Sequence, residues 1–87
     1  LNLDPADVAR RVGPRTRAVL AVHQLGIPAD LAPLQALCDR HGLALLEDAA
    51  CAIGSEVRRE GRWERVGRPH SRAACFSFHP RKLLTTG

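Results

Sequence analysis

The amino-acid sequence predicts an α/β fold, with a mostly parallel sheet and flanking helices, and three consecutive segments carry this prediction. RAVLAVH, residues 17–23, is a nearly continuous apolar run of strand length. A helical pattern follows over residues 31–41, and LALLE, residues 43–47, is a second apolar run. Strand, helix and strand within about thirty residues form a right-handed βαβ unit with parallel strands. Continuous apolar runs are typical of strands buried on both faces.

The two helices are predicted from their ends. Asp4 can cap a first helix that has Pro5 at its first position and runs to about Arg11. Asp30 can cap a second helix, and Gly42 is a good C-terminal stop for it. The apolar residues that recur at helical spacing in the second helix are Leu31, Leu34 and Cys38.

A small inserted β-hairpin is predicted over EVRREGRWERV, residues 56–66, with its turn near Gly61. Alternation along this segment is expected to direct Val57, Trp63 and Val66 toward the protein. The arginines of the segment are then expected to face water.

Polar side chains are predicted to gather at one edge of the sheet. ACFSF, residues 74–78, has the pattern of another buried strand. If that strand is also parallel, Ser77 and the loop that bears Lys82 reach the same edge as Asp48, which follows the second strand. His23 ends the first strand at this edge. Ligands of open α/β sheets bind beyond the carboxyl ends of the strands, so this edge is the candidate site.

Composition narrows the classes of function. The chain has 87 residues, a formal net charge of +4 and only one Trp and two Phe. Without a stacking platform or a recognised nucleic-acid module, the basic hairpin is expected to be solvated rather than to bind nucleic acid. Three cysteines at wide spacing without a CxxC pair argue against a disulfide framework and a structural zinc site. No signal peptide, transmembrane run or lipidation motif is visible, which favours the cytoplasm and no membrane partner.

Two stretches, ALLEDAACAIGS and AACFSFHPRKLLTTG, resemble the core of the DegT/DnrJ/StrS family of pyridoxal-phosphate-dependent sugar aminotransferases, which have the aspartate-aminotransferase (type I) fold. AVHQLGIPADL and NLDPADVARRVGPRTRAVL are similar to the segments that precede this core. The resemblance implies that residues 1–87 are the central segment of the cofactor-binding large domain. It also implies an N-terminal part and a C-terminal small domain outside this chain, and a homodimer in the full-length protein.

Carried over residue by residue, the resemblance implies that Lys82 links covalently to pyridoxal 5′-phosphate, that Asp48 pairs with its ring nitrogen, and that Ser77 binds its phosphate. A lysine amine serves as nucleophile and then as proton carrier. Cys51 is also assigned to the cofactor-binding set; many family members have a glutamine at this position, and a thiol is a poor donor for the ring hydroxyl but fits the space. His23 is assigned to the cofactor-binding set, with a purely structural histidine as the alternative.

The function that follows is transfer of an amino group from an amino acid, glutamate or glutamine, to a keto-sugar nucleotide. One alternative is a dehydratase-type relative, but those family members have histidine in place of the lysine, and this chain has Lys82. Another is a cofactor-free α/β binding or regulatory module with the basic hairpin as its contact surface. The isolated 87-residue chain is expected to be inactive.

Overall fold

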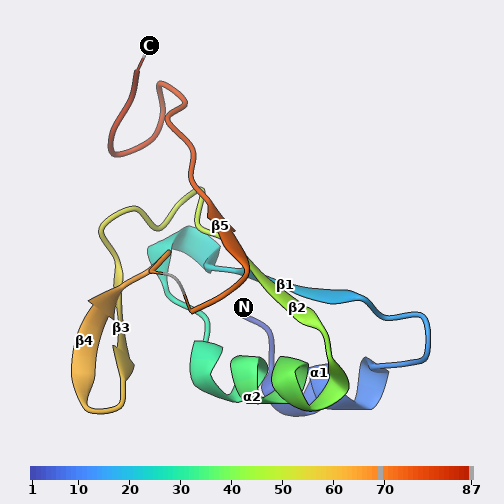
Figure 1. Ribbon diagram of the computed structural model, residues 1–87. Helices are drawn as coiled ribbons and strands as arrows, with labels where there is room; N and C mark the ends of the chain where they lie inside the picture. Colours follow the sequence, from blue (N-terminus) through green and yellow to red (C-terminus); the bar gives the residue numbers. More distant parts are fainter. Residues whose placement is uncertain (69, 87) are drawn as a thin grey trace.

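The computed structural model of the protein describes residues 1–68 and 70–86. Three strands form a parallel sheet, two helices cover it, and a separate hairpin lies beside it (Figure 1). The elements in chain order are α1 (Pro5–Arg11), β1 (Ala18–Val22), the short 3-10 helix η1 (Gln24–Gly26), α2 (Leu31–His41), β2 (Ala44–Asp48), β3 (Glu56–Arg59), β4 (Arg62–Arg65) and β5 (Ala73–Cys75).

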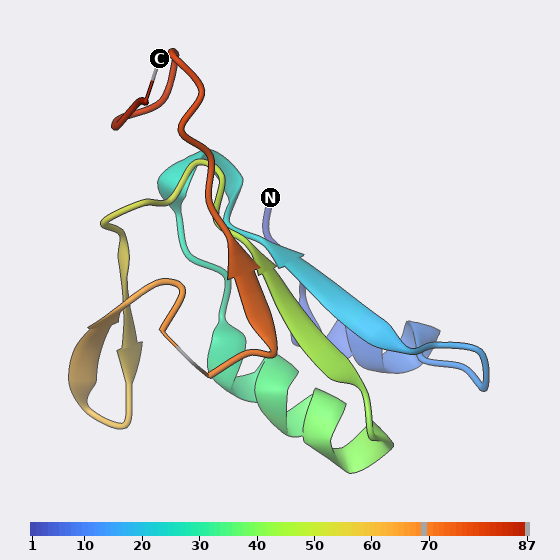
Figure 2. The ribbon, with the colours of Figure 1, turned by 45° about the horizontal axis from the view of Figure 1, so that its top comes forward.

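The sheet has the strand order β1-β2-β5, and both pairings are parallel. This confirms the predicted βαβ unit and the parallel return strand. In the register of the sheet, Val22 pairs with Asp48 and Asp48 pairs with Cys75. The carboxyl ends of all three strands therefore lie side by side, and Figure 2 shows the C-terminal segment continuing beyond this edge.

The helix ends follow the expected chemistry. The Asp4 side chain accepts a hydrogen bond from Ala6 N at 2.9 Å and caps α1. Hydrogen bonds from Arg11 and then Arg10 lower the pKa of the exposed Asp7 carboxyl in the first turn. In α2, Asp30 is the N-cap residue but its side chain makes no capping bond, whereas Gly42 closes the helix at a φ of +64°.

One apolar core lies between the helices and the sheet. α2 packs on β1 and β2, and Val8 of α1 lies against the same cluster. The buried members of the cluster are Val19, Ala21, Ala29, Leu31, Leu34, Cys38 and Leu45. The helical spacing of the sequence thus identified the face of α2 that is buried.

The prediction that strand 17–23 is buried on both faces is wrong for the described residues. Val19 and Ala21 are buried, but Leu20 between them keeps 54% of its surface exposed. Both helices lie on one face of the sheet (Figures 1 and 2), so side chains that point to the other face stay open. A continuous apolar run does not show which face of the sheet the helices of this chain cover.

The third strand is shorter and more exposed than predicted. β5 ends at Cys75, so the Phe-Ser-Phe stretch over 76–78 lies beyond it as irregular chain. In the described part of the chain β5 pairs only with β2, which makes it an edge strand, and both Ala73 and Cys75 are exposed. Ser77 is therefore placed by a loop rather than by the sheet.

The hairpin forms where it was predicted, but the orientation predicted for Trp63 is wrong. Glu60 and Gly61 form a two-residue turn with positive φ at both positions, so Arg58 pairs with Trp63 and Val57 with Glu64. Side-chain parity therefore reverses across the turn. Val57 is half-buried, whereas Trp63 is on the opposite face of the hairpin and is 66% exposed. Beyond β4, Val66 is buried as expected.

Candidate active site at the carboxyl edge of the sheet

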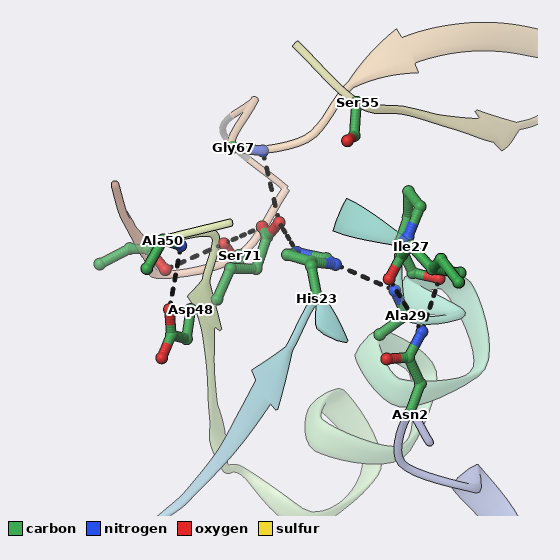
Figure 3. A network of polar contacts seen from close by, with 12 residues as sticks. Asn2, His23, Ile27, Ala29, Asp48, Ala50, Ser55, Gly67 and Ser71 are labelled. Carbon is green, nitrogen blue, oxygen red and sulfur yellow. Dashed lines mark hydrogen bonds and ion pairs between the residues drawn. The ribbon is translucent and has the colours of Figure 1, made fainter. Parts of the chain in front are cut away.

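Asp48 is the last residue of β2 and stands at the carboxyl edge of the sheet. Its Oδ1 accepts a hydrogen bond from Ala50 N at 3.0 Å (Figure 3), which fixes the carboxylate against the turn that follows. No other side chain in the described residues bonds to it, so Oδ2 is available to a ligand. A half-buried carboxylate with one fixed and one open oxygen can accept a proton-bearing nitrogen.

Lys82 reaches back from the C-terminal segment to the loop after β2. Its Nζ lies 3.0 Å from Cys51 Sγ and donates to it. The turn that carries the lysine is closed by a hydrogen bond from Lys82 N to His79 O at 2.8 Å. Nowhere in residues 1–68 and 70–86 does a carboxylate lie within ion-pair distance of the amine. A thiol is a weak partner, so the amine is held in place but is not neutralised.

A pocket of about 300 Å³ opens beside this pair. It mixes apolar walls with the two basic side chains, as expected for a ligand pocket with a few polar groups. Its lining residues are Leu25, Ala50, Cys51, Ile53, Arg81, Lys82 and Leu83.

The Cys51 loop is fixed against η1. Ser55 Oγ donates to Gly26 O at 2.8 Å. Gly26 has a φ of +82°, and a Cβ there would lie 3.1 Å from Cys51 O, so the two backbones approach closely. Gly26 therefore allows the loop that carries Cys51 to lie close to η1.

Ser77 lies two residues beyond β5 and is half-buried. Its Oγ accepts from His79 N at 3.3 Å, so the hydroxyl hydrogen remains available to another acceptor. His79 Nδ1 in turn accepts from Arg81 N at 3.2 Å. These local bonds shape the turn between the serine and the lysine.

His23 is a buried histidine with both ring nitrogens engaged. It is 1% exposed, its Nε2 lies 3.0 Å from Glu47 Oε2, and its Nδ1 accepts from Ala29 N at 2.9 Å. Within the described residues, these contacts are those of a structural histidine, the alternative given for His23. Its assignment to the cofactor-binding set stays a prediction. Sequence reasoning did not identify Glu47, the partner of His23, or the residues Gly67 and Ser71 that also bond to Glu47. The sequence offered one signal, a glutamate on the same side of the strand as the apolar residues Leu45 and Ala49, which the structure buries.

The structure therefore brings Lys82 and Cys51 into contact and places Asp48 at the same edge. No hydrogen bond or ion pair among the described residues joins Lys82 to Asp48 or to Ser77. A larger pocket of about 480 Å³, lined by Arg17, Gln35 and Arg72 among others, lies at the opposite edge, where β2 begins. It contains none of the predicted site residues, so size alone does not identify the site.

The buried thiol of Cys38 lies in the apolar core and not at the candidate site. Burial, and to a lesser extent the charge of Asp39, raises the pKa of the Cys38 thiol, as expected for an unreactive core cysteine. No group of three or more His, Cys, Asp or Glu side chains in the described residues has the arrangement of a metal site. Among these residues, no helix combines the length and apolar character that crossing a bilayer requires.

Comparison with known proteins gives one consistent result. The DegT/DnrJ/EryC1/StrS aminotransferase family matches residues 1–87. The erythromycin biosynthesis sensory transduction protein EryC1 of Saccharopolyspora erythraea is 54% identical over 83 residues, which is 95% of this chain. The dTDP-3-amino-3,4,6-trideoxy-α-D-glucose transaminase of Streptomyces venezuelae is 52% identical over 83 residues, also 95% of this chain. The chain spans 21% of the length of each of these curated relatives.

Solved structures agree with the sequence relatives. The sugar aminotransferase CalS13 from Micromonospora echinospora superposes with a TM-score of 0.86 at 36% identity, over 100% of this chain and 24% of that protein. An aminotransferase from Psychrobacter cryohalolentis gives a TM-score of 0.87 at 31% identity, over 99% of this chain and 20% of that protein. The α/β fold with its parallel sheet therefore matches the corresponding part of these aminotransferases.

Proposed function

Because the chain belongs to the DegT/DnrJ/EryC1/StrS aminotransferase family, we propose that the protein is a pyridoxal-phosphate-dependent aminotransferase. The amino group passes from an amino acid, glutamate or glutamine, to a keto-sugar nucleotide. The observation that carries the proposal is the placement of Lys82 against Cys51, with a pocket beside it and Asp48 at the same edge. The similarity to the dTDP-3-amino-3,4,6-trideoxy-α-D-glucose transaminase supports the substrate class. The homodimer and the cytoplasmic location stay predictions.

The residues present fit the cofactor. Pyridoxal 5′-phosphate requires an amine for its aldehyde, a carboxylate for its ring nitrogen and donors for its phosphate. Lys82 offers an amine that no carboxylate neutralises, and Asp48 offers an open Oδ2. Ser77 offers a hydroxyl hydrogen because its oxygen already accepts from the backbone. When bound, the cofactor supplies a carbonyl that condenses with amines and a ring that withdraws electrons from the substrate carbon.

The roles of the side chains follow from their chemistry. Lys82 Nζ would hold the cofactor through its aldehyde, and its free amine would serve as the base and acid that carries a proton. Asp48 keeps the ring nitrogen protonated, because a carboxylate holds that proton more strongly than an amide does. Ser77 orients the phosphate. Cys51, 3.0 Å from Nζ, occupies the space beside the reacting amine.

The test uses the full-length protein, incubated with pyridoxal 5′-phosphate, reduced with borohydride and mapped by peptide mass spectrometry. Lys82 is the only lysine among residues 1–87, so a pyridoxyl group on a lysine of this segment identifies it without ambiguity. The Lys82→Ala variant is the matched control. It should lose the adduct and slow transamination to a keto-sugar nucleotide by about a hundredfold or more, the usual contribution of a positioned acid–base group.

The result also separates the alternatives. A protein that folds but forms no pyridoxyl adduct would support the cofactor-free module, an alternative consistent with the name of EryC1 as a sensory transduction protein. An adduct on Lys82 combined with loss of the sugar hydroxyl rather than gain of an amine would support the dehydratase-type reaction. An adduct on a lysine outside this segment would refute the role of Lys82.

A further inference from the structure

A carboxylate is buried inside the domain one residue before Asp48. Glu47 is 1% exposed, and its partners His23, Gly67 and Ser71 are labelled in Figure 3. Its Oε2 lies 3.0 Å from His23 Nε2 and accepts from Gly67 N at 3.3 Å. Its Oε1 accepts from Ser71 Oγ at 2.5 Å. A buried carboxylate is tolerated only when such donors replace its lost hydration.

The network has a defined direction. Ala29 N donates to His23 Nδ1 at 2.9 Å, so that nitrogen is the acceptor and carries no hydrogen. The hydrogen of the neutral ring is therefore on Nε2, which donates to Glu47. His23 connects the backbone at the start of α2 to the carboxylate in β2, and it follows directly after β1. One side chain thus joins the ends of β1 and β2 with the entrance to α2.

The same carboxylate holds the loop that leads into the third strand. Gly67 and Ser71 are 20 and 24 residues from Glu47 in sequence and belong to the connection between the hairpin and β5. Gly67 lies directly against Phe76, since a Cβ on this glycine would be 2.4 Å from Phe76 Cζ. Phe76 immediately precedes Ser77. A continuous series of contacts therefore runs from Glu47 through Gly67 to the residue before the candidate phosphate-binding serine.

We propose that Glu47 is a positioning residue that sets the place of Ser77 relative to Asp48 through its contacts with His23, Gly67 and Ser71. Packing does not require a carboxylate here, because the neighbours of the same strand parity, Leu45 and Ala49, are apolar and buried. An apolar residue cannot accept the three hydrogen bonds that Glu47 accepts from the end of β1 and from the loop before β5. The effect on the cofactor rests on the proposed function; the effect on the loop does not.

Two substitutions of similar size separate hydrogen bonding from packing. In Glu47→Gln, the amide oxygen can take the place of Oε2 and accept from His23 and Gly67. Its NH₂ can donate to Ser71 Oγ, whose hydroxyl then donates to Ala73 O, 3.2 Å away. Glu47→Leu introduces an apolar side chain of comparable volume and leaves His23 Nε2 and Gly67 N without their acceptor, while Ser71 Oγ keeps only Ala73 O. Ser71→Ala removes one donor without altering residue 47 and serves if the leucine variant does not fold.

The experiment measures two quantities in the full-length protein. Hydrogen exchange of the apo protein over residues 74–78 should be about tenfold faster in Glu47→Leu and unchanged in Glu47→Gln. Titration of Glu47→Leu with pyridoxal 5′-phosphate should give a Kd about tenfold weaker than that of the wild type, whereas the Kd for pyridoxal should be unchanged. In a double-mutant cycle with Ser77→Ala, the two losses should not add, because they remove the same phosphate contact.

Each outcome decides the proposal. Unchanged exchange over 74–78 in both Glu47→Leu and Ser71→Ala would overturn it, whatever the cofactor does. Equal weakening for pyridoxal and its phosphate, or additive effects with Ser77→Ala, would show that Glu47 does not act through the serine. If the wild-type protein forms no adduct at Lys82, the proposed function fails, while the exchange data still decide whether Glu47 positions the loop.

Discussion

Gly67 provides the sharpest test of how the loop after the hairpin is packed, because Gly54 is a matched control for it. Both glycines have a left-handed backbone, with φ of +81° and +82°. A Cβ at Gly54 would meet nothing within 4 Å, whereas one at Gly67 would lie 2.4 and 2.7 Å from two carbons of the Phe76 ring. The two alanine substitutions therefore share the backbone cost and differ in the overlap with Phe76, since the added contact with Ala74 Cβ at 3.4 Å is an ordinary van der Waals contact.

The expected magnitudes follow from these two terms. The left-handed backbone costs an alanine about 1–2 kcal/mol, which is the whole effect expected for Gly54→Ala. Gly67→Ala adds the cost of moving an aromatic ring from its place, about 1 kcal/mol, at the low end of the range for overpacking. The low end applies because Phe76 is 37% exposed and its ring has room to move.

The assay is hydrogen exchange of the full-length protein, which gives the free energy of local opening for peptides around each glycine. Gly67→Ala should lower the opening free energy by about 1 kcal/mol more than Gly54→Ala does. Combining Gly67→Ala with Phe76→Leu should remove that extra loss, because the leucine side chain does not extend to the ring carbons near Gly67. Equal losses in the two single variants would refute the reasoning, since the ring would then swing away at no cost.

Two further predictions concern the cysteines. Cys51→Gln, which introduces the residue that many family members have there, should tighten pyridoxal 5′-phosphate binding by about fivefold through one added hydrogen bond; an unchanged Kd in titrations would show that this position does not contact the ring hydroxyl. Burial raises the pKa of Cys38 in the folded protein above its ordinary value of 9.0. The stability this contributes is complete below pH 9.0 and is lost as the pH rises through the folded pKa, because the unfolded thiol ionises first. Urea midpoints should therefore fall above pH 9.0 more steeply for the wild type than for Cys38→Ala, and parallel curves would contradict the burial argument.

Much of the fold could be predicted because its signals are local. Asp4, Gly42 and the apolar spacing of Leu31, Leu34 and Cys38 act within one helix, and the structure confirms the two helices they indicated. The parallel pairing of β1 with β2 follows from the length of the connecting helix. The shared edge for Asp48 and the loop bearing Lys82 then needs only one further assumption, that the third strand is parallel, and β5 is.

The errors came from properties that depend on partners in space. The direction of Trp63 depends on the two-residue turn at Glu60 and Gly61, since a turn one residue longer would have restored the expected parity. The exposure of Leu20 depends on which helices cover the sheet, and an apolar run carries no information on that. In both cases the local pattern was correct and the missing quantity was a register or a layer.

Glu47 and Asp48 show why the sequence predicted only part of the site. The Glu-Asp pair ends the apolar strand β2, and strand alternation sends the two carboxylates to opposite faces. Asp48 could be assigned from its position at the edge, whereas the donors of Glu47 come from a strand end and from a loop 20 to 24 residues away. In the proposed site, the outward carboxylate contacts the cofactor and the inward one determines where the serine meets it. Adjacent acids of one motif would then have separate tasks, and substitution of Glu47 and of Asp48 should change different properties of the site: phosphate preference for the first, and the state of the ring nitrogen for the second.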